Sequence, residues 1–213
     1  MSYKKNLRKM GRKLYKIPVT DLLCNVIGYE CPEKEIRIVE CSKDDADRVI
    51  VPHHYSHKVT KNSCINMLVY YKNHLGGALQ IGYGIRPKIK GDLNADKTRE
   101  FDRMWLDDIM PKFSETIVIS LLHHFLRKAH KEIKHLISYA DTSAGMTGTI
   151  YRAASYRLVA ELKADFYILA NGERVHPVTM WHRHGTRAWG FLQRVYKGIR
   201  KAEGKQLKFI KDL

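Results

Sequence analysis

The stretch from Tyr139 to Tyr156 constrains the fold more than any other part of the chain. An apolar run, Leu136–Ala140, is typical of a buried strand, and Asp141, a loop carrying Gly145 and Gly148, and a short helical pattern follow it. In α/β folds, the loop between the carboxyl end of a strand and a helix is where ligand sites lie. The alternative is an ordinary connection in which Asp141 caps the helix. Both interpretations predict a strand, a loop and a helix here.

Positive charge gathers at the two ends of the sequence. The chain has 213 residues and a formal net charge of +16. Residues 1–17 hold seven basic residues and no acid, and residues 181–213 hold nine basic and two acidic residues. Such flanks favour polyanions, because neutralising phosphates releases counterions. We therefore expect nucleic acid as the partner, with a solvated basic tail or an anionic membrane surface as the alternatives.

Hydrophobic periodicity predicts one mixed α/β (α+β) domain. Gly82 and Gly84 are expected to mark a bulge or the close approach of a ligand. The expected elements are a strand at 35–40; a helix capped by Ser42 and ending near Pro52; strands at 65–71 and 78–85 with a turn at 73–77; a strand at 99–106; a helix capped by Ser114 and reaching Ala129; a strand at 135–140; a short helix that includes Tyr151; and a final hairpin of 156–162 with 165–170.

The composition excludes several classes of protein. No apolar run is long enough to span a bilayer, and the basic N-terminus lacks the apolar core of a signal peptide. The four cysteines show no C-x-x-C pair, which disfavours a zinc ribbon and indicates a reduced chain. We expect a cytoplasmic protein without a membrane partner.

Several short segments, in a fixed order between residues 35 and 165, resemble the Mom family of phage DNA modification proteins. That family is similar to the GCN5-related N-acetyltransferase (GNAT) fold. The segments are His54-Tyr55-Ser56, Gly82-Tyr83-Gly84, Glu100–Asp107, Pro111–Thr116, and Tyr139–Asp141 with Gly148–Ala154. The resemblance implies a single GNAT-like catalytic domain at 35–170, with a mixed, mostly antiparallel central sheet flanked by helices. A basic arm and lead-in at 1–34 precedes it, and a basic, aromatic extension at 171–213 follows it. The resemblance further implies methylcarbamoylation of the N6 amine of adenine in DNA, which shields phage DNA from host restriction.

The resemblance also implies particular site residues. The catalytic roles fall on His54, Tyr55, Asp141 and Tyr151. Arg103, Ser114 and Thr116 are expected to bind a cofactor, which the fold suggests is acetyl-CoA or a related donor. The turn at 112–116 has no glycine, whereas acetyltransferases hold the cofactor pyrophosphate with a glycine-rich turn.

The chemistry of adenine N6 suggests how these residues act. N6 is a poor nucleophile, so an enzyme must hold the amine, accept its proton and exclude water. Asp141 is expected to accept from the amine and Tyr151 to donate to a leaving group, although Tyr151 also fits an ordinary core tyrosine. The histidine-rich segment 53–57 suggests a stacking platform, a general base or part of a metal site. Iron held by His54 and Asp141 is one such site.

The target amine is unreachable inside a duplex, so we expect base flipping or action on single strands. Two alternatives stay open: a GNAT-like protein that binds nucleic acid without catalysis, and an acetyl-CoA-dependent N-acetyltransferase of a small amine or protein. The sequence does not indicate an oligomeric state. The residues expected to contact DNA are Lys4, Lys5, Arg8, Arg152, Arg183 and Arg187.

Overall fold

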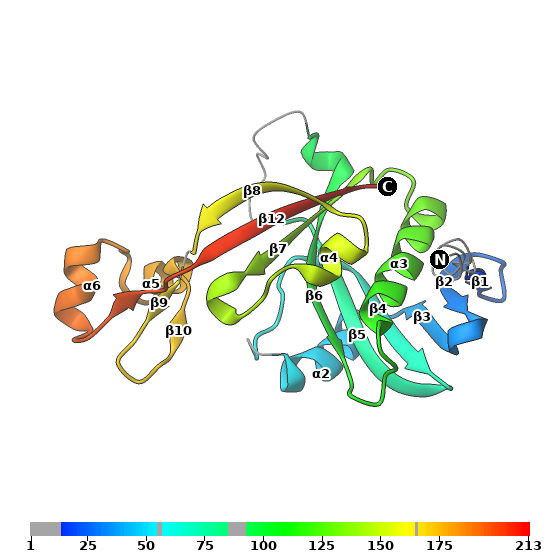
Figure 1. Cartoon of the computed structure of the whole chain (residues 1–213), viewed down its shortest axis with the longest axis horizontal. Helices are drawn as coiled ribbons and strands as arrows, with labels where there is room; N and C mark the ends of the chain where they lie inside the picture. Colours follow the sequence, from blue (N-terminus) through cyan, green and yellow to red (C-terminus); the bar gives the residue numbers. More distant parts are fainter. Residues whose placement is uncertain (1–13, 55–56, 85–92, 165) are drawn as a thin grey trace, which may run out of the picture. The chain divides into compact units, whose positions relative to one another are not determined.

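The computed structural model describes residues 14–54, 57–84, 93–164 and 166–213. They form two compact units, and Figure 1 shows their elements: the first unit covers the chain to Leu136 together with Asp212–Leu213, and the second covers residues 137–211. The first unit contains β1 (Ile17–Thr20), β2 (Val26–Cys31), η1 (Pro32–Lys34), β3 (Ile36–Glu40), α2 (Lys43–His53), β4 (Ser63–Tyr71), β5 (His74–Gly82), η2 (Ala95–Lys97), β6 (Thr98–Leu106) and α3 (Ser114–Ala129). The second contains β7 (His135–Asp141, beginning in the first unit), η3 (Thr142–Ala144), α4 (Thr149–Ala153), β8 (Arg157–Lys163), β9 (Tyr167–Ile168), β10 (Arg174–Val175), α5 (Pro177–His184), α6 (Trp189–Val195), β11 (Arg200–Lys201) and β12 (Lys205–Asp212, ending in the first unit).

Strands β1 to β6 of the first unit lie in chain order, and each pairs antiparallel with the next. Strand β5 is buried at every residue from Gly76 to Gly82, so both faces of the sheet are covered there. Helix α2 packs Ala46 and Ile50 against Ala78 of β5, and helix α3 packs against β2 and β3. The predicted class, α+β with a mostly antiparallel sheet, is confirmed.

The two longer helices of the first unit begin differently. Ser42 caps α2 as predicted, since its Oγ accepts from the backbone N–H of Asp45 at 3.1 Å. The predicted cap of α3 is wrong: the N-cap is Phe113, in the left-handed region at φ 69°, and Ser114 is the first helical residue. The turn at Pro111 explains the shift, because the Ser114 hydroxyl donates backwards to the Pro111 carbonyl at 2.5 Å rather than forwards into the helix.

The β4–β5 hairpin has a shorter turn than the sequence predicts. Lys72 and Asn73 both have positive φ, 48° and 64°, as a two-residue turn requires. Strand β5 therefore begins at His74, and Gly76 and Gly77 lie inside it, where the predicted turn at 73–77 placed them in the loop.

The predicted hairpin of 156–162 with 165–170 is wrong. Strand β8 pairs antiparallel with β12, from Arg157 opposite Ile210 to Lys163 opposite Lys205, and the order in the second unit is β7, β12, β8. Strand β9 instead pairs with β10 and β11 in a separate three-stranded sheet. The partner of β8 is therefore β12, from the end of the chain, and not the neighbouring segment 165–170.

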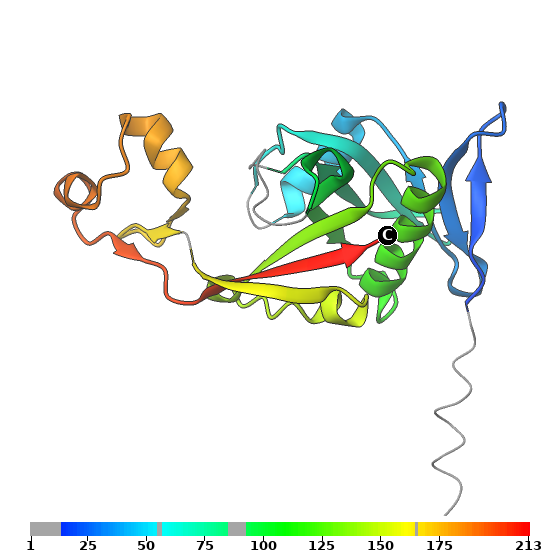
Figure 2. The ribbon, with the colours of Figure 1, turned by 90° about the horizontal axis from the view of Figure 1, so that it is seen from above.

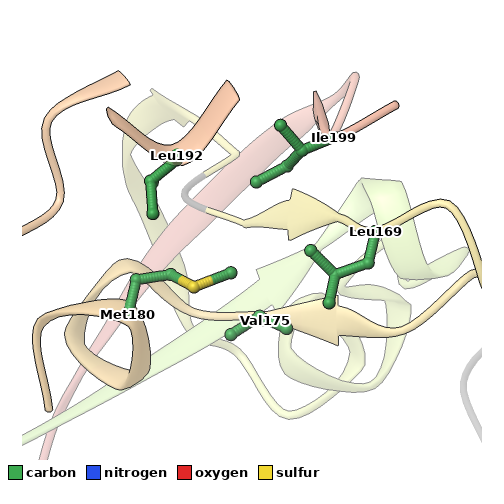
Figure 3. Packing of buried hydrophobic residues seen from close by; sticks show 5 residues of the cluster. All are labelled: Leu169, Val175, Met180, Leu192 and Ile199. Carbon is green, nitrogen blue, oxygen red and sulfur yellow. The ribbon is translucent and has the colours of Figure 1, made fainter. Parts of the chain in front are cut away.

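The segment between β8 and β12 has a small core of its own. Leu169, Val175, Met180, Leu192 and Ile199 converge there, as Figure 3 shows, and all five are buried. In Figures 1 and 2 the helices and short strands of this segment group together beyond the ends of β8 and β12.

The described strands also extend beyond the central segment of the predicted three-part division. In the lead-in, β2 pairs with β3 across residue 35, and β12 lies in the extension. The division at residues 34 and 170 stays a prediction. Among the described residues, no helix is both long and apolar enough to cross a membrane.

Candidate functional site

Strand β6 contains a β-bulge next to Arg103, one of the candidate residues of the first unit. Gln80 of β5 lies opposite Arg103 and Ile81 lies opposite Phe101, so Asp102 is an extra residue in β6. Bulges re-aim side chains and occur often beside active sites. Gly82 makes room for this carboxyl group, since a Cβ on Gly82 would lie 2.2 Å from Asp102 Oδ2.

Asp102 carries a carboxyl group with unusual surroundings. Its Oδ2 is buried and has no hydrogen-bond partner within the described part of the chain. Burial, helped by the nearby Glu100 and opposed by Arg103, raises the pKa of Asp102 to about 7. At neutral pH a substantial fraction of the molecules therefore carries the carboxylate and the rest the neutral acid, a state suited to exchanging protons.

His54 lies at the C-terminal end of α2, where its backbone N–H donates to Ile50 O at 2.7 Å. Burial, together with the positive charges of Arg103 and His57, lowers the pKa of His54 to about 4. The imidazole is neutral at pH 7 and has one donor and one acceptor nitrogen. His53 stacks on Trp105 of β6, with ring centroids 4.1 Å apart and an interplanar angle of 15°, which holds the end of α2 against the bulged strand. Tyr55 lies outside the described residues.

The residues predicted to bind a cofactor at the start of α3 have local partners. Ser114 is 1% exposed and its hydroxyl donates to Pro111 O at 2.5 Å, while the Thr116 hydroxyl donates to Phe113 O at 2.8 Å. Glu115 adds a negative charge in the same turn. Both hydroxyl protons are thus committed to backbone carbonyls, and a role in cofactor binding stays a prediction.

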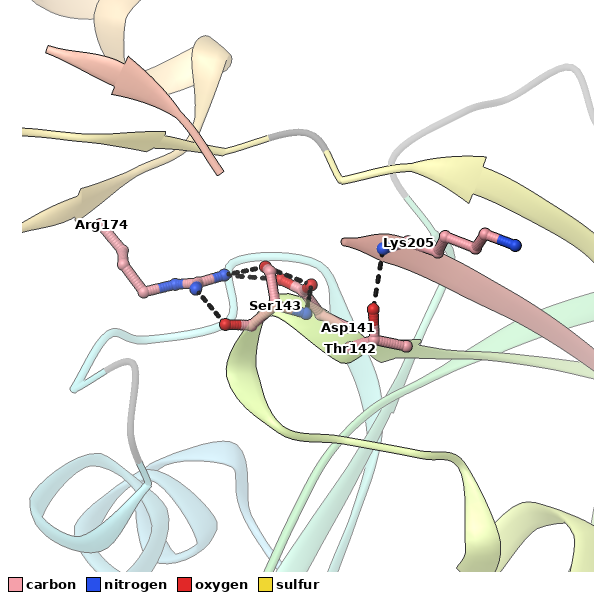
Figure 4. Close-up of polar contacts among 5 residues, drawn as sticks. All are labelled: Asp141, Thr142, Ser143, Arg174 and Lys205. Atoms are coloured by element: carbon pink, nitrogen blue, oxygen red, sulfur yellow. Dashed lines mark hydrogen bonds and ion pairs between the residues drawn. The ribbon is translucent and has the colours of Figure 1, made fainter. Parts of the chain in front are cut away.

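In the second unit, Asp141 is held by donors on both carboxylate oxygens (Figure 4). Oδ1 accepts from the backbone N–H and the hydroxyl of Ser143, at 2.9 and 2.5 Å, and Oδ2 accepts from Arg174 at 2.7 Å. Arg174 also donates to the Ser143 carbonyl and hydroxyl, at 2.8 Å each. Asp141 is only 9% exposed. Because its side chain accepts from the Ser143 N–H, it caps η3 and not the following α4, which the alternative interpretation predicts. Its other carboxylate oxygen binds Arg174.

Tyr151 belongs to an aromatic group at the start of α4. Its ring lies 5.4 Å from that of Tyr156 and 5.5 Å from that of Phe209. Burial and the neighbouring Tyr151 hydroxyl raise the pKa of Tyr156. The Arg152 guanidinium lies 5.3 Å from the Phe209 ring centroid and donates to Thr147 O at 2.6 Å. The catalytic role predicted for Tyr151 and the DNA contact predicted for Arg152 stay predictions.

The other residues predicted to contact DNA are exposed or lie outside the described residues. Arg183 pairs with Glu173 at 3.0 Å, and Arg187 is exposed. Lys4, Lys5 and Arg8 lie outside the described residues.

Sequence reasoning missed Asp102 and Arg174. Asp102 stands in the segment Glu100–Asp107, and the available signal was Gly82 of the neighbouring strand, whose missing side chain leaves room for the carboxyl group. Arg174 gave no signal, because its partner Asp141 lies 33 residues away in sequence.

The described residues contain no cluster of side chains that matches the predicted iron site at His54 and Asp141. No group of three or more His, Cys, Asp or Glu side chains that could hold a metal ion occurs in the described ranges, which omit residues 1–13, 55–56, 85–92 and 165. Iron held by His54 and Asp141 stays a prediction, and the proposed mechanism assigns no step to it.

The sequence profile of the Mom protein family matches residues 35–213. The chain belongs to the Mom family. Methylcarbamoylase Mom of Escherichia phage Mu is 30% identical over 176 residues, which cover 81% of this chain and 72% of that protein. Membership of this family confirms the resemblance seen in the short segments.

Solved structures show the fold of this Mom family member. RimL, a ribosomal L7/L12 α-N-protein acetyltransferase, matches in its apo form with a TM-score of 0.50 at 10% identity, covering 84% of this chain and 93% of RimL. RimL in complex with coenzyme A matches with a TM-score of 0.50 at 9% identity, covering 84% and 94%. These similarities confirm the predicted GNAT-like fold.

Proposed function

We propose that this protein is a methylcarbamoylase that modifies the N6 amine of adenine in DNA and so protects phage DNA from restriction. The observation that carries the proposal is the match of residues 35–213 to the Mom family, together with the 30% identity to the methylcarbamoylase of phage Mu. The buried, polar surroundings of the β6 bulge support chemistry rather than binding alone.

The N6 amine must lose a proton as it forms its new bond, because the nitrogen would otherwise be left with a positive charge. We assign Asp102 as the proton acceptor: its Oδ2 is buried and has no hydrogen-bond partner among the described residues, and its pKa of about 7 suits the task. His54, neutral at pH 7, is suited to orienting the base. Asp141 is better suited to positioning its loop, because donors occupy both of its oxygens. Tyr151 keeps the role expected from the chemistry of the reaction, that of proton donor to the leaving group.

The donor of the transferred group is proposed to be of the coenzyme A type, since the similar RimL structure holds coenzyme A. The start of α3 does not fit a pyrophosphate in the usual way. Its turn has no glycine, the hydroxyl protons of Ser114 and Thr116 are committed, and Glu115 repels phosphate. No step of the mechanism is therefore assigned to the coenzyme A donor. Calorimetric titration with acetyl-CoA tests the proposal, and absence of heat would exclude that donor.

The substrate is proposed to be double-stranded DNA with the target adenine flipped out, in the cytoplasm of a bacterial host. Flipping costs a few kcal/mol of stacking and pairing but exposes the amine to a pocket.

Mass spectrometry of nucleosides tests the proposal. Plasmid DNA from bacteria that produce the full chain should contain a heavier derivative of deoxyadenosine, absent from DNA of cells with an empty vector. A binding protein without catalysis leaves the nucleoside profile unchanged, and an acetyltransferase of small amines or proteins places its product outside the DNA. Either result, obtained with soluble protein, would contradict the proposal.

A further inference from the structure

The connection between β8 and β12 is far longer than the pairing of these strands requires. Lys163 and Lys205 face each other at the end of the ladder, so a turn of two to five residues or so could join them. The chain instead forms an insert, defined here as residues 166–204, with three short strands and helices α5 and α6.

The insert is built as a module with a closed base. Ala164 N–H donates to Gly204 O at 3.2 Å and Ala202 N–H donates to Phe166 O at 2.8 Å, which holds the two chain ends together. Above this base lies the buried cluster of Figure 3, against which Tyr167, Trp189, Phe191 and Tyr196 pack. A core of this kind allows the insert to present its surface side chains in fixed positions.

The base of the insert is tied to the loop after β7. Arg174 of β10 donates to Asp141 and Ser143, and Lys205 N–H donates to the Thr142 hydroxyl at 2.8 Å (Figure 4). Gly204 permits this close approach, since a Cβ there would lie 2.9 Å from the Ser143 nitrogen.

Most of the positive charge of the insert is not used internally. Its sequence holds seven Lys and Arg residues against two acids, Glu173 and Glu203. Arg174 and Arg183 are paired with carboxylates, and Lys201 lies 5.1 Å from the Trp189 ring centroid. The remaining four are exposed and form no ion pair with any described residue: Arg187, Arg194, Lys197 and Arg200.

Exposed cations on a rigid module are suited to a polyanion. Each phosphate neutralised by Lys or Arg releases counterions, and Arg can bind a phosphate with two parallel hydrogen bonds. The insert also exposes Trp181 on α5 at 54%, an aromatic face of the kind on which bases stack.

We propose that the insert is a DNA-docking module that grips backbone phosphates through Arg187, Arg194, Lys197 and Arg200. This inference rests on the proposed function for its choice of DNA as the polyanion. It assigns binding of the substrate to a part of the chain distinct from the residues of the β6 bulge.

Binding of a fluorescein-labelled DNA duplex to the full chain, followed by fluorescence anisotropy at several KCl concentrations, tests the proposal. One variant combines Arg187→Gln, Arg194→Gln, Lys197→Gln and Arg200→Gln. The matched control combines Lys34→Gln, Lys97→Gln, Lys128→Gln and Lys131→Gln, which removes the same charge from exposed positions of the first unit. Circular dichroism establishes that both variants are folded.

In the insert variant, the negative slope of the logarithm of the binding constant against the logarithm of salt concentration should become shallower by about 3 to 4. Each phosphate contact contributes about 0.9 to the size of this slope. Binding should also weaken at least ~10-fold. The control should change the slope by less than about 1. Equal losses in both variants would overturn the proposal in favour of diffuse attraction, and unchanged binding in the insert variant would also overturn it. Tighter, insert-dependent binding of transfer RNA than of DNA would refute the choice of partner.

The binding assay needs no donor, so its outcome is separate from that of the proposed function. If the wild type modifies adenine and the insert variant binds DNA normally, only the proposal of a docking module is refuted. If DNA binding depends on the insert but the wild type leaves adenine unmodified, only the proposed function is refuted.

Discussion

Asp141 is buried and Asp102 is partly buried, with one fully buried carboxylate oxygen, and the surroundings of the two residues differ. Asp141 accepts from Ser143 and Arg174, and these bonds connect the loop after β7 with β10 at the base of the insert. Asp102 has an unpartnered oxygen among the described residues, a raised pKa, and Gly82 close to its Oδ2. Hydrogen bonds to a carboxylate fix its position. A buried carboxyl oxygen without hydrogen-bond donors raises the pKa of its group, which can then exchange protons near neutral pH.

The pH dependence of adenine modification should report Asp102. Its pKa lies above the ordinary value of 3.8, at about 7, so the proton-accepting carboxylate is populated only as the pH rises. Activity in a cell extract supplied with plasmid DNA should rise between about pH 6 and pH 8, with its midpoint near 7. The rate of formation of the modified nucleoside measures it. A rate that is flat over this range would argue against Asp102 as the acceptor.

Breaking the Asp141–Arg174 pair should destabilise the second unit. Asp141→Asn leaves Arg174 without its charged partner in a partly buried site, which we expect to cost about 2 kcal/mol and to lower Tm by about 5 °C. Arg174→Met removes the other partner. The double variant should lose less than the sum of the two, as measured by thermal unfolding, because the two residues share one interaction. Strict additivity would show that the pair does not act as a unit.

Sequence reasoning found the residues whose signal is local and missed those whose role comes from a distant partner. The Ser42 cap follows from the three residues after it. The roles of Asp102 and Asp141 depend on Gly82 and Arg174, which lie in other elements. The place of Asp141 at the end of a strand and the family resemblance predicted a catalytic role, which stays a prediction, and the sequence did not show that Ser143 and Arg174 donate to its carboxylate.

At the scale of elements, strands and helices with a clear period were predictable, including β3, β6, α3 and β7. Pairings between remote segments were not. The pairing of β8 with β12 closes a loop that contains the whole insert, and no local pattern reports such a contact.

The start of α4 requires glycine at position 148. Gly148 has φ of +71°, and a Cβ there would lie 2.5 Å from the Phe209 ring. Gly148→Ala should therefore destabilise the protein by roughly 2–4 kcal/mol, from backbone strain and displacement of the ring.

Gly190 offers the matched control for this substitution. It lies inside α6, and no described atom outside its own stretch of helix lies within 4 Å of the position that a Cβ would take. Gly190→Ala should therefore stabilise the helix by about 0.5–1 kcal/mol. Chemical denaturation of both variants measures the contrast. Equal effects of the two changes would contradict the geometry described for Gly148.

At the scale of the whole molecule, the sequence indicated the family, the fold class and the concentration of charge at the chain ends. It did not indicate that residues 166–204 form a module with a core of their own, since the five core residues are spread over short strands and two helices with no common period. Proton transfer is thus assigned to the β6 bulge and DNA docking to this insert.

The most direct test is the nucleoside profile of plasmid DNA from cells producing three proteins: the wild type, Asp102→Asn, and the control Asp108→Asn at an exposed position after β6. We expect a heavier deoxyadenosine with the wild type and the control, and a loss of about 10²-fold or more with Asp102→Asn. No heavier deoxyadenosine with the wild type, or full modification by folded Asp102→Asn protein, would contradict the roles assigned here.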